Sequence, residues 1–178
     1  MTTGFVERLA AARIGGTFNQ YAESGLRRER LARYLGERRQ AGVLLVGEAP
    51  GYRGTRVSGI PLTSERLLTG SGPAEATATI VHRVLGELGL RDDVLLWNVV
   101  PTHPGDERSN RAPTRAEARE GVAFVRALAG GRQVVPLGRI AQAALGGPYV
   151  RHPSHGGASE FRAALARIAG GGCGADAD

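Results

Sequence analysis

The sequence has no lysine and only one cysteine, and each scarcity excludes a class of chemistry. All 23 residues counted as lysine or arginine are arginine. The only amine left for a Schiff base is the α-amino group of Met1, and a Walker A loop would lack its lysine. The single cysteine, Cys173, excludes an internal disulfide framework, a cysteine-based zinc site and an iron–sulfur cluster, because each needs several sulfur atoms.

Long hydrophobic runs are also missing. No stretch of about 18 apolar residues occurs, and Met1 is not followed by a basic region and an apolar core. We therefore expect a cytoplasmic protein with no membrane partner. The 178 residues suffice for about one domain, and 42% hydrophobic with 22% charged residues is ordinary for a soluble globular chain.

The net charge of +6 is compatible with a polyanionic partner, but it also serves solubility. The strongest basic segment is residues 26–40, LRRERLARYLGERRQ, in which Leu31, Tyr34 and Leu35 share one helical face. Two interpretations are open for its arginines. They either contact phosphates or form the solvated face of an amphipathic helix.

Apolar runs alternate with helical patterns along the chain. Runs at 43–46, 94–100 and 133–137, and a stub at 149–150, predict strands that are buried on both faces. This alternation predicts one α/β domain in three layers, with a mostly parallel central four-stranded sheet flanked by helices.

Helices are predicted between these strands. A helical lead occupies residues 1–24, the α/β domain residues 25–169, and a disordered tail residues 170–178. The spacing of Thr114 and Glu117 predicts a capping box. The domain helices are expected at 26–40, near 63–68, and at 74–88, 114–129, 139–145 and 159–168, whereas 48–62 is expected to be irregular.

Three loops that follow strands carry the polar residues most suited to chemistry. They are residues 47–59, 98–104 and 151–157. Ligands bind beyond the carboxyl ends of parallel strands, so these loops are expected to converge on one crevice. His152 and His155 alone make a weak metal site without a third ligand, and we expect no metal and no cofactor.

Three motifs in chain order resemble the uracil-DNA glycosylase superfamily. VGEAPG at 46–51 follows one strand, LLWNVV at 95–100 ends the next, and HPS at 152–154 precedes the last helix. The first motif is similar to that of the GEAPG-type branch. The resemblance covers about residues 43–168, and the segment 58–64 fits the family's segment after the first motif.

The resemblance implies a role for each motif. Glu48 would orient or activate the attacking water, and His152 would hydrogen-bond the uracil O2 as negative charge develops. Asn98 would read the edge of the flipped base. The other expected base-pocket residues are Gly47, Ala49, Gly51, Tyr52 and Leu62, and the expected phosphate contacts are Pro153, Ser154, His155 and Gly156.

Several positions depart from the family pattern. Leu62 stands where members commonly place a phenylalanine that stacks on the base, and Ala49 where some branches place a catalytic aspartate. In other branches of the family an aromatic ring at the position of Gly51 excludes a 5-methyl group. Tyr52 is a substitute for that ring here. The segment 155–157 has no apolar wedge, which favours single-stranded or mismatched DNA. The four cluster cysteines of the GEAPG branch are absent.

We therefore expect a monomeric, monofunctional DNA glycosylase that releases uracil or another deaminated base from DNA without a lysine. Such a reaction needs a donor near the base oxygen, a carboxylate near the sugar, and water. One alternative is a catalytically weak or inactive member that binds damaged or abasic DNA. Another is a small-molecule hydrolase that uses Ser154, although the G-x-S-x-G motif is missing.

Overall fold

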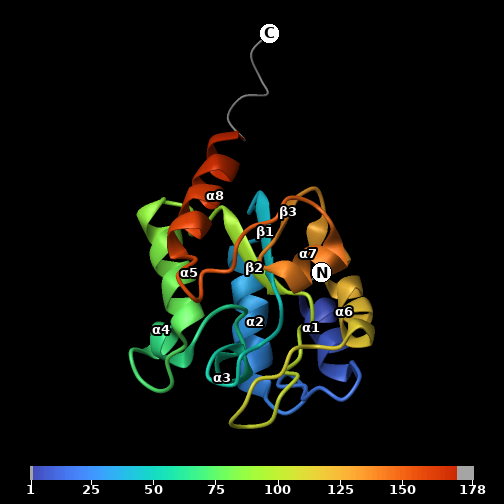
Figure 1. The fold of residues 1–178 in the computed structure, drawn as a ribbon. Helices are drawn as coiled ribbons and strands as arrows, with labels where there is room; N and C mark the ends of the chain where they lie inside the picture. Colours follow the sequence, from blue (N-terminus) through green and yellow to red (C-terminus); the bar gives the residue numbers. More distant parts are fainter. Residues whose placement is uncertain (1, 172–178) are drawn as a thin grey trace.

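A parallel three-stranded sheet forms the centre of the computed structural model, which describes residues 2–171 (Figure 1). The strands are β1 (Val43–Gly47), β2 (Val94–Asn98) and β3 (Gln133–Pro136), in the order β2-β1-β3. The register places Gly47 opposite Asn98, so β1 and β2 end together. The predicted α/β class and the parallel sheet with flanking helices are confirmed.

The prediction of a fourth strand at residues 149–150 is wrong. Only Val150 pairs with the sheet, through a single parallel bridge to Leu137 and a 2.8 Å hydrogen bond from Gly138 N to Val150 O. Gly146, Gly147 and Pro148 lie directly before this bridge. Glycine and proline disfavour a regular strand, so pairing stops at one residue.

Eight helices occupy the described residues, and every helix predicted from the sequence is found, although the helix of the lead predicted over residues 1–24 ends at Ala11. The additional one, α3, is a single turn inside the segment expected to be irregular. None of the helices in residues 2–171 is long and apolar enough to cross a membrane. Of the predicted tail, residues 170–171 complete the last helix and 172–178 lie outside the described residues. The helices are α1 (Thr2–Ala11), α2 (Gly25–Glu37), α3 (Thr55–Ser58), α4 (Glu65–Thr69), α5 (Ala76–Glu87), α6 (Arg115–Ala129), α7 (Arg139–Leu145) and α8 (Ala158–Gly171).

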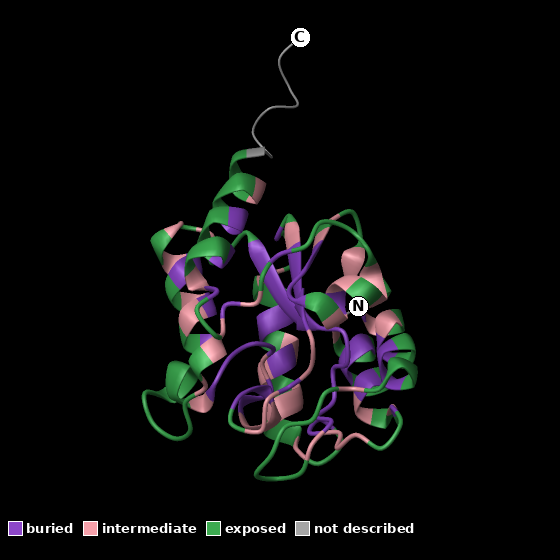
Figure 2. Cartoon of the chain, viewed as in Figure 1, coloured by how far each residue is buried: buried purple, intermediate pink, exposed green. Residues whose placement is uncertain are grey.

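Helices flank the sheet on both sides (Figure 1). Helices α5 and α8 lie together on one side, linked by an ion pair between Glu87 and Arg162 at 3.3 Å. Helices α1 and α6 lie on the other side, where the rings of Phe5 and Phe124 meet edge to face at 5.8 Å. Between them β2 is wholly buried and β1 is buried except for Val43, whereas the first two residues of β3 are not buried (Figure 2).

The N-terminal helix is packed into the main hydrophobic core. Phe5 contacts the fully buried Trp97 of β2 edge to face, with ring centroids 5.5 Å apart. Val6 and Leu9 on the same face of α1 are also buried. Burial of this apolar face, rather than helix propensity, stabilises α1.

The predicted capping box at the start of α6 is confirmed. Thr114 Oγ1 accepts from Glu117 N at 3.2 Å, and Glu117 Oε2 accepts from Thr114 N at 2.8 Å. The Glu117 carboxylate also accepts two hydrogen bonds from the Arg111 guanidinium, at 2.6 and 2.8 Å. These bonds favour the charged form and lower the pKa of Glu117 to about 2.

Two arginines of α2 fit neither interpretation offered for the basic segment. Arg27 Nε donates to Val57 O at 3.0 Å, and Arg30 pairs with Glu65 at 2.8 Å while its Nη1 reaches Ser58 O at 3.3 Å. Both side chains therefore hold the segment around α3 against α2. Their guanidinium groups donate hydrogen bonds to carbonyl oxygens and pair with a carboxylate of the protein itself.

Replacing Phe5 tests the contribution of α1. Phe5→Ala removes a 5% exposed aromatic ring from its contacts with Trp97 and Phe124, and we expect a loss of about 3–5 kcal/mol in the free energy of unfolding. Urea denaturation measures this loss. The control is Glu7→Ala on the exposed face of α1, which is expected to change stability by less than about 0.5 kcal/mol. Equal unfolding midpoints for the two variants would contradict the packing of α1.

The lowered pKa of Glu117 predicts that the protein loses stability in acid. Because its pKa falls from 4.5 to about 2 in the folded protein, ionised Glu117 stabilises the fold above pH 4.5, and this contribution is lost as the pH drops toward 2. Glu117→Gln removes the contribution, so its free energy of unfolding is expected to change less between pH 5 and pH 3. Urea titrations at both pH values measure the difference, with Glu23→Gln as an exposed control. Parallel curves for all three proteins would show that Glu117 has no such role.

Candidate active site

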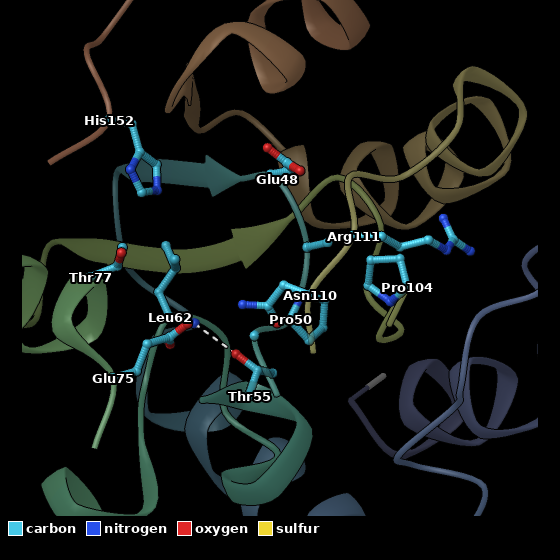
Figure 3. Close-up of a pocket in the computed structure, with 12 residues that line it drawn as sticks. Glu48, Pro50, Thr55, Leu62, Glu75, Thr77, Pro104, Asn110, Arg111 and His152 are labelled. Atoms are coloured by element: carbon cyan, nitrogen blue, oxygen red, sulfur yellow. Dashed lines mark hydrogen bonds between the residues drawn. The ribbon is translucent and has the colours of Figure 1, made fainter. Parts of the chain in front are cut away.

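A cavity of about 180 Å³ lies beyond the carboxyl ends of β1 and β2 (Figure 3). Its walls come from the segment after β1, the loop after β2 and the segment after Val150, so the three loops expected to converge do meet. The volume is below the roughly 300–1,000 Å³ of drug-sized pockets, which suits a small ligand. The lining residues are Glu48, Ala49, Pro50, Gly51, Thr55, Leu62, Glu75, Thr77, Pro104, Asn110, Arg111 and His152.

Glu48 brings a carboxyl group to the cavity wall. Its backbone is fixed by hydrogen bonds that continue the pairing of the two strands, from Val99 N to Gly47 O at 2.8 Å and from Val100 N to Glu48 O at 3.0 Å. Partial burial raises the pKa of the Glu48 carboxyl above its ordinary value. A carboxylate with a raised pKa is a better proton acceptor.

His152 presents a hydrogen-bond donor to the same cavity. Its Nδ1 accepts from the backbone N–H of Ser154 at 3.3 Å and lies 2.7 Å from the Ser154 hydroxyl. Burial, with a smaller effect of the neighbouring His155, lowers the pKa of His152, so the neutral ring dominates at neutral pH. With Nδ1 accepting, the proton of the neutral ring resides on Nε2, which is left to act as a donor.

Asn98 lies just behind the cavity and does not line it. The residue ends β2 and is 1% exposed. A Cβ atom at Gly47 would lie 3.0 Å from Asn98 Oδ1, so the glycine makes room for the amide. Among the described residues Asn98 Oδ1 has no hydrogen-bond partner, and a buried acceptor without a donor costs about 1–3 kcal/mol.

Leu62 forms the apolar wall next to this amide. Its Cδ2 would lie 3.2 Å from a Cβ at Gly47, the glycine that also adjoins Asn98. The Leu62 backbone has φ 51°, the left-handed region that favours glycine, and its N–H donates to Thr55 Oγ1 at 3.1 Å. Loop contacts therefore hold Leu62 in a strained conformation between the cavity and Asn98.

Of the other residues predicted to recognise the base, some lie at the cavity and one does not. Ala49 and Gly51 line the cavity, and Gly47 adjoins Asn98 and Leu62. Tyr52 is not among the lining residues. Its backbone N–H donates to Asn110 Oδ1 at 2.9 Å, and its ring lies beneath the Arg53 guanidinium at 5.4 Å.

The residues predicted to bind phosphate follow His152 along the chain but do not line the cavity. Pro153 is buried, and the Ser154 hydroxyl lies within hydrogen-bond distance of the rings of both His152 and His155. His155 and Gly156 are exposed and have φ 52° and 80°. The structure thus places a tight, partly exposed turn beside His152.

Several lining residues were missed by sequence reasoning. Glu75 and Thr77 lie where α5 begins, and Asn110 and Arg111 lie in the long loop after β2. None belongs to a motif or directly follows a strand, so no local signal marked them. Within residues 2–171 no three His, Cys, Asp or Glu side chains are grouped so that they could hold a metal ion.

Comparisons with known proteins agree with this architecture. Residues 34–168 match the family model described as the Uracil DNA glycosylase superfamily. The structure is similar to the crystal structure of wild-type SMUG2 from Pedobacter heparinus, with a TM-score of 0.70, 13% sequence identity, and coverage of 96% of this chain and 97% of that one. A search of curated proteins gives no match. The structural likeness at this identity concerns the fold, while the family match spans more than half of the sequence, and the chain therefore belongs to the uracil DNA glycosylase superfamily.

Proposed function

We propose that this protein is a monofunctional DNA glycosylase that hydrolyses the N-glycosidic bond of uracil or another deaminated base and leaves an abasic site. The family match supports a reaction of this class. The observation that carries the proposal is the meeting of the Glu48 carboxyl and the His152 ring at one small cavity, with the Asn98 amide directly behind it.

The two cavity-lining groups suit the two charges that develop during the reaction. As the bond between the sugar C1′ and the base nitrogen breaks, its electron pair moves to the base, and His152 Nε2–H donates to the base oxygen that becomes negative. The sugar becomes oxocarbenium-like, and the Glu48 carboxylate stabilises it and accepts a proton from water. The water oxygen then bonds to C1′.

Asn98 supplies the recognition of the base edge. Its unpartnered Oδ1 is an acceptor for an imide N–H such as N3–H of uracil, and an amide can donate to the adjacent carbonyl oxygen as well. Pairing of the buried Oδ1 would remove the free-energy cost of its isolation. Leu62 must move or repack for the base to reach this amide.

A second candidate function follows from the position of Leu62. Asn98 is 1% exposed and does not line the cavity. A member of the family whose amide stays covered would bind abasic or damaged DNA without releasing a base.

For either function we propose that Pro153, Ser154, His155 and Gly156 contact phosphates flanking the extruded nucleotide. We also propose that the protein acts as a cytoplasmic monomer.

The decisive experiment measures base release from labelled oligonucleotides that contain uracil in single strands, opposite guanine and opposite adenine, followed by alkali cleavage at abasic sites. The parent protein is expected to produce cleavable sites. Asn98→Ala and His152→Ala are expected to slow release by about tenfold to a thousandfold, because each removes a group that contacts the departing base.

Melting temperatures and the exposed control Glu23→Ala separate catalysis from folding. Folded variants with the parent's rate would remove those residues from the mechanism. Retained binding of all three substrates without any cleavage by the parent would select the binding-only function.

Salt dependence tests DNA as the partner. Arginine–phosphate contacts release counterions, so affinity for an oligonucleotide with an abasic-site analogue is expected to fall about tenfold or more between about 50 and 200 mM salt. Fluorescence anisotropy measures the affinity. An affinity that does not change with salt would rule out phosphate contacts as a main source of binding.

A further inference from the structure

Glu75 directs its carboxyl group toward the cavity instead of capping the helix that it precedes. It occupies the N-cap position of α5, yet its side chain makes no capping hydrogen bond. Only its backbone oxygen takes part, accepting from the N–H and the hydroxyl of Thr79, both at 3.0 Å. An acidic side chain near a helix N-terminus is stabilised by the free backbone N–H groups there. Glu75 makes no hydrogen bond to them, so its orientation into the cavity needs another explanation.

Two glycines of the loop after β1 make room for this carboxyl group. A Cβ atom at Gly51 would collide with Glu75 Oε1, and a Cβ atom at Gly54 would collide with Glu75 Oε2. Gly51 has no left-handed φ, so space for the carboxyl group is a reason for glycine there. At Gly54 the backbone, with φ −104° and ψ −119°, lies outside the α and β regions and favours glycine as well. The carboxyl group occupies volume that side chains at both positions would otherwise fill.

The Glu75 carboxyl has no hydrogen-bond or ion-pair partner among residues 2–171 whose contacts are described. Burial raises its pKa above the ordinary value. Arg111, the one cationic side chain among the lining residues, is instead paired with Glu117. The wall beside Gly51 therefore carries a polar group that is available to whatever enters the cavity.

The proposed function leaves one edge of a pyrimidine unassigned. N1 carries the sugar, the O2 edge faces His152, and the N3–H and O4 edge faces Asn98. The edge that remains is C5–C6. Among the lining groups to which the proposed function gives no role, Glu75 is the one carboxyl group, and it lies against Gly51 of the loop after β1.

We propose, on the basis of that function, that Glu75 is a specificity-determining residue whose carboxyl group excludes a base with an apolar substituent at C5. Thymine, the ordinary DNA base that differs from uracil by a 5-methyl group, is the competitor that this site must reject.

A carboxyl group is suited to this rejection where an apolar wall is not. An apolar pocket discriminates one methyl group by only about 10–200-fold, and a cavity with free space would favour the larger base. A methyl group pressed against a carboxyl group displaces its water and supplies no hydrogen bond in return. Leu62, the apolar neighbour, would accept a methyl group, and Tyr52 lies outside the cavity lining. Glu75 is thus the lining side chain at this wall that opposes one.

The test compares single-turnover release of uracil and thymine, each opposite guanine in otherwise identical duplexes. The proteins are the parent, Glu75→Ala, Glu75→Gln and the control Glu23→Ala, each checked by thermal melting. In Glu75→Ala the ratio of the uracil rate to the thymine rate is expected to fall at least tenfold. Glu75→Gln keeps the volume and a polar group, so its ratio is expected to fall less. Glu23→Ala is expected to keep the parent's ratio.

Three results would overturn the inference. An unchanged ratio in folded Glu75→Ala and Glu75→Gln, with uracil still released, removes Glu75 from specificity and leaves the proposed function intact. An equal loss of both rates assigns Glu75 to positioning of the loop or to catalysis. If the parent releases no uracil from any substrate, the proposed function fails and this inference fails with it.

Discussion

The parallel pairing of β1 with β2 is the interaction on which the site depends. The register aligns Gly47 with Asn98, and two further backbone hydrogen bonds carry the alignment beyond the strands into the segment with Glu48. A shift of the register by one residue would turn Asn98 to the other face of the sheet and separate it from the cavity. The apolar residues of both strands are buried in the core, so hydrophobic burial positions the polar group of Asn98 at the edge of the sheet.

Several arginines of this lysine-free chain serve the fold itself. Arg27, Arg30 and Arg132 donate to backbone carbonyl groups within the fold, where a planar guanidinium with five donors serves better than an ammonium group. Other arginines, such as Arg53 and Arg108, have exposed side chains. Net charge alone therefore overstates the number of arginines available to a polyanion, because several donate to backbone carbonyl groups of the protein itself.

Much of the fold was predictable because its signals are local. Apolar runs marked β1, β2 and β3, and the capping box marked α6. The one-turn helix α3 was not predictable, because four residues carry no periodicity and the turn is stabilised from outside by Arg27 and by the Tyr21 hydroxyl, which donates to Gly59 O at 3.1 Å. The fourth strand was wrongly predicted, because a pair of apolar residues is a local signal. That signal cannot show that only Val150 pairs with the sheet.

In the site, too, residues with a local sequence signal were predictable and residues placed by distant contacts were not. Glu48 and His152 were predicted from motifs at strand ends, and the cavity brings them together. Glu75 was missed because its position depends on two glycines more than twenty residues earlier in the chain, a relation that exists only in three dimensions. Tyr52 carried a plausible signal, an aromatic ring next to a glycine, but the Asn110 side chain and Arg53 hold it elsewhere.

The left-handed backbone of Leu62 has a consequence for ligand entry. A leucine in that conformation costs roughly 1–2 kcal/mol relative to the right-handed region, and neighbouring contacts maintain it. The free protein thus already bears part of the energetic penalty of rearranging the segment between α3 and α4. A rearrangement that returned the Leu62 backbone to the right-handed region would recover this energy, and it would offset part of the cost of breaking the bond to Thr55 Oγ1.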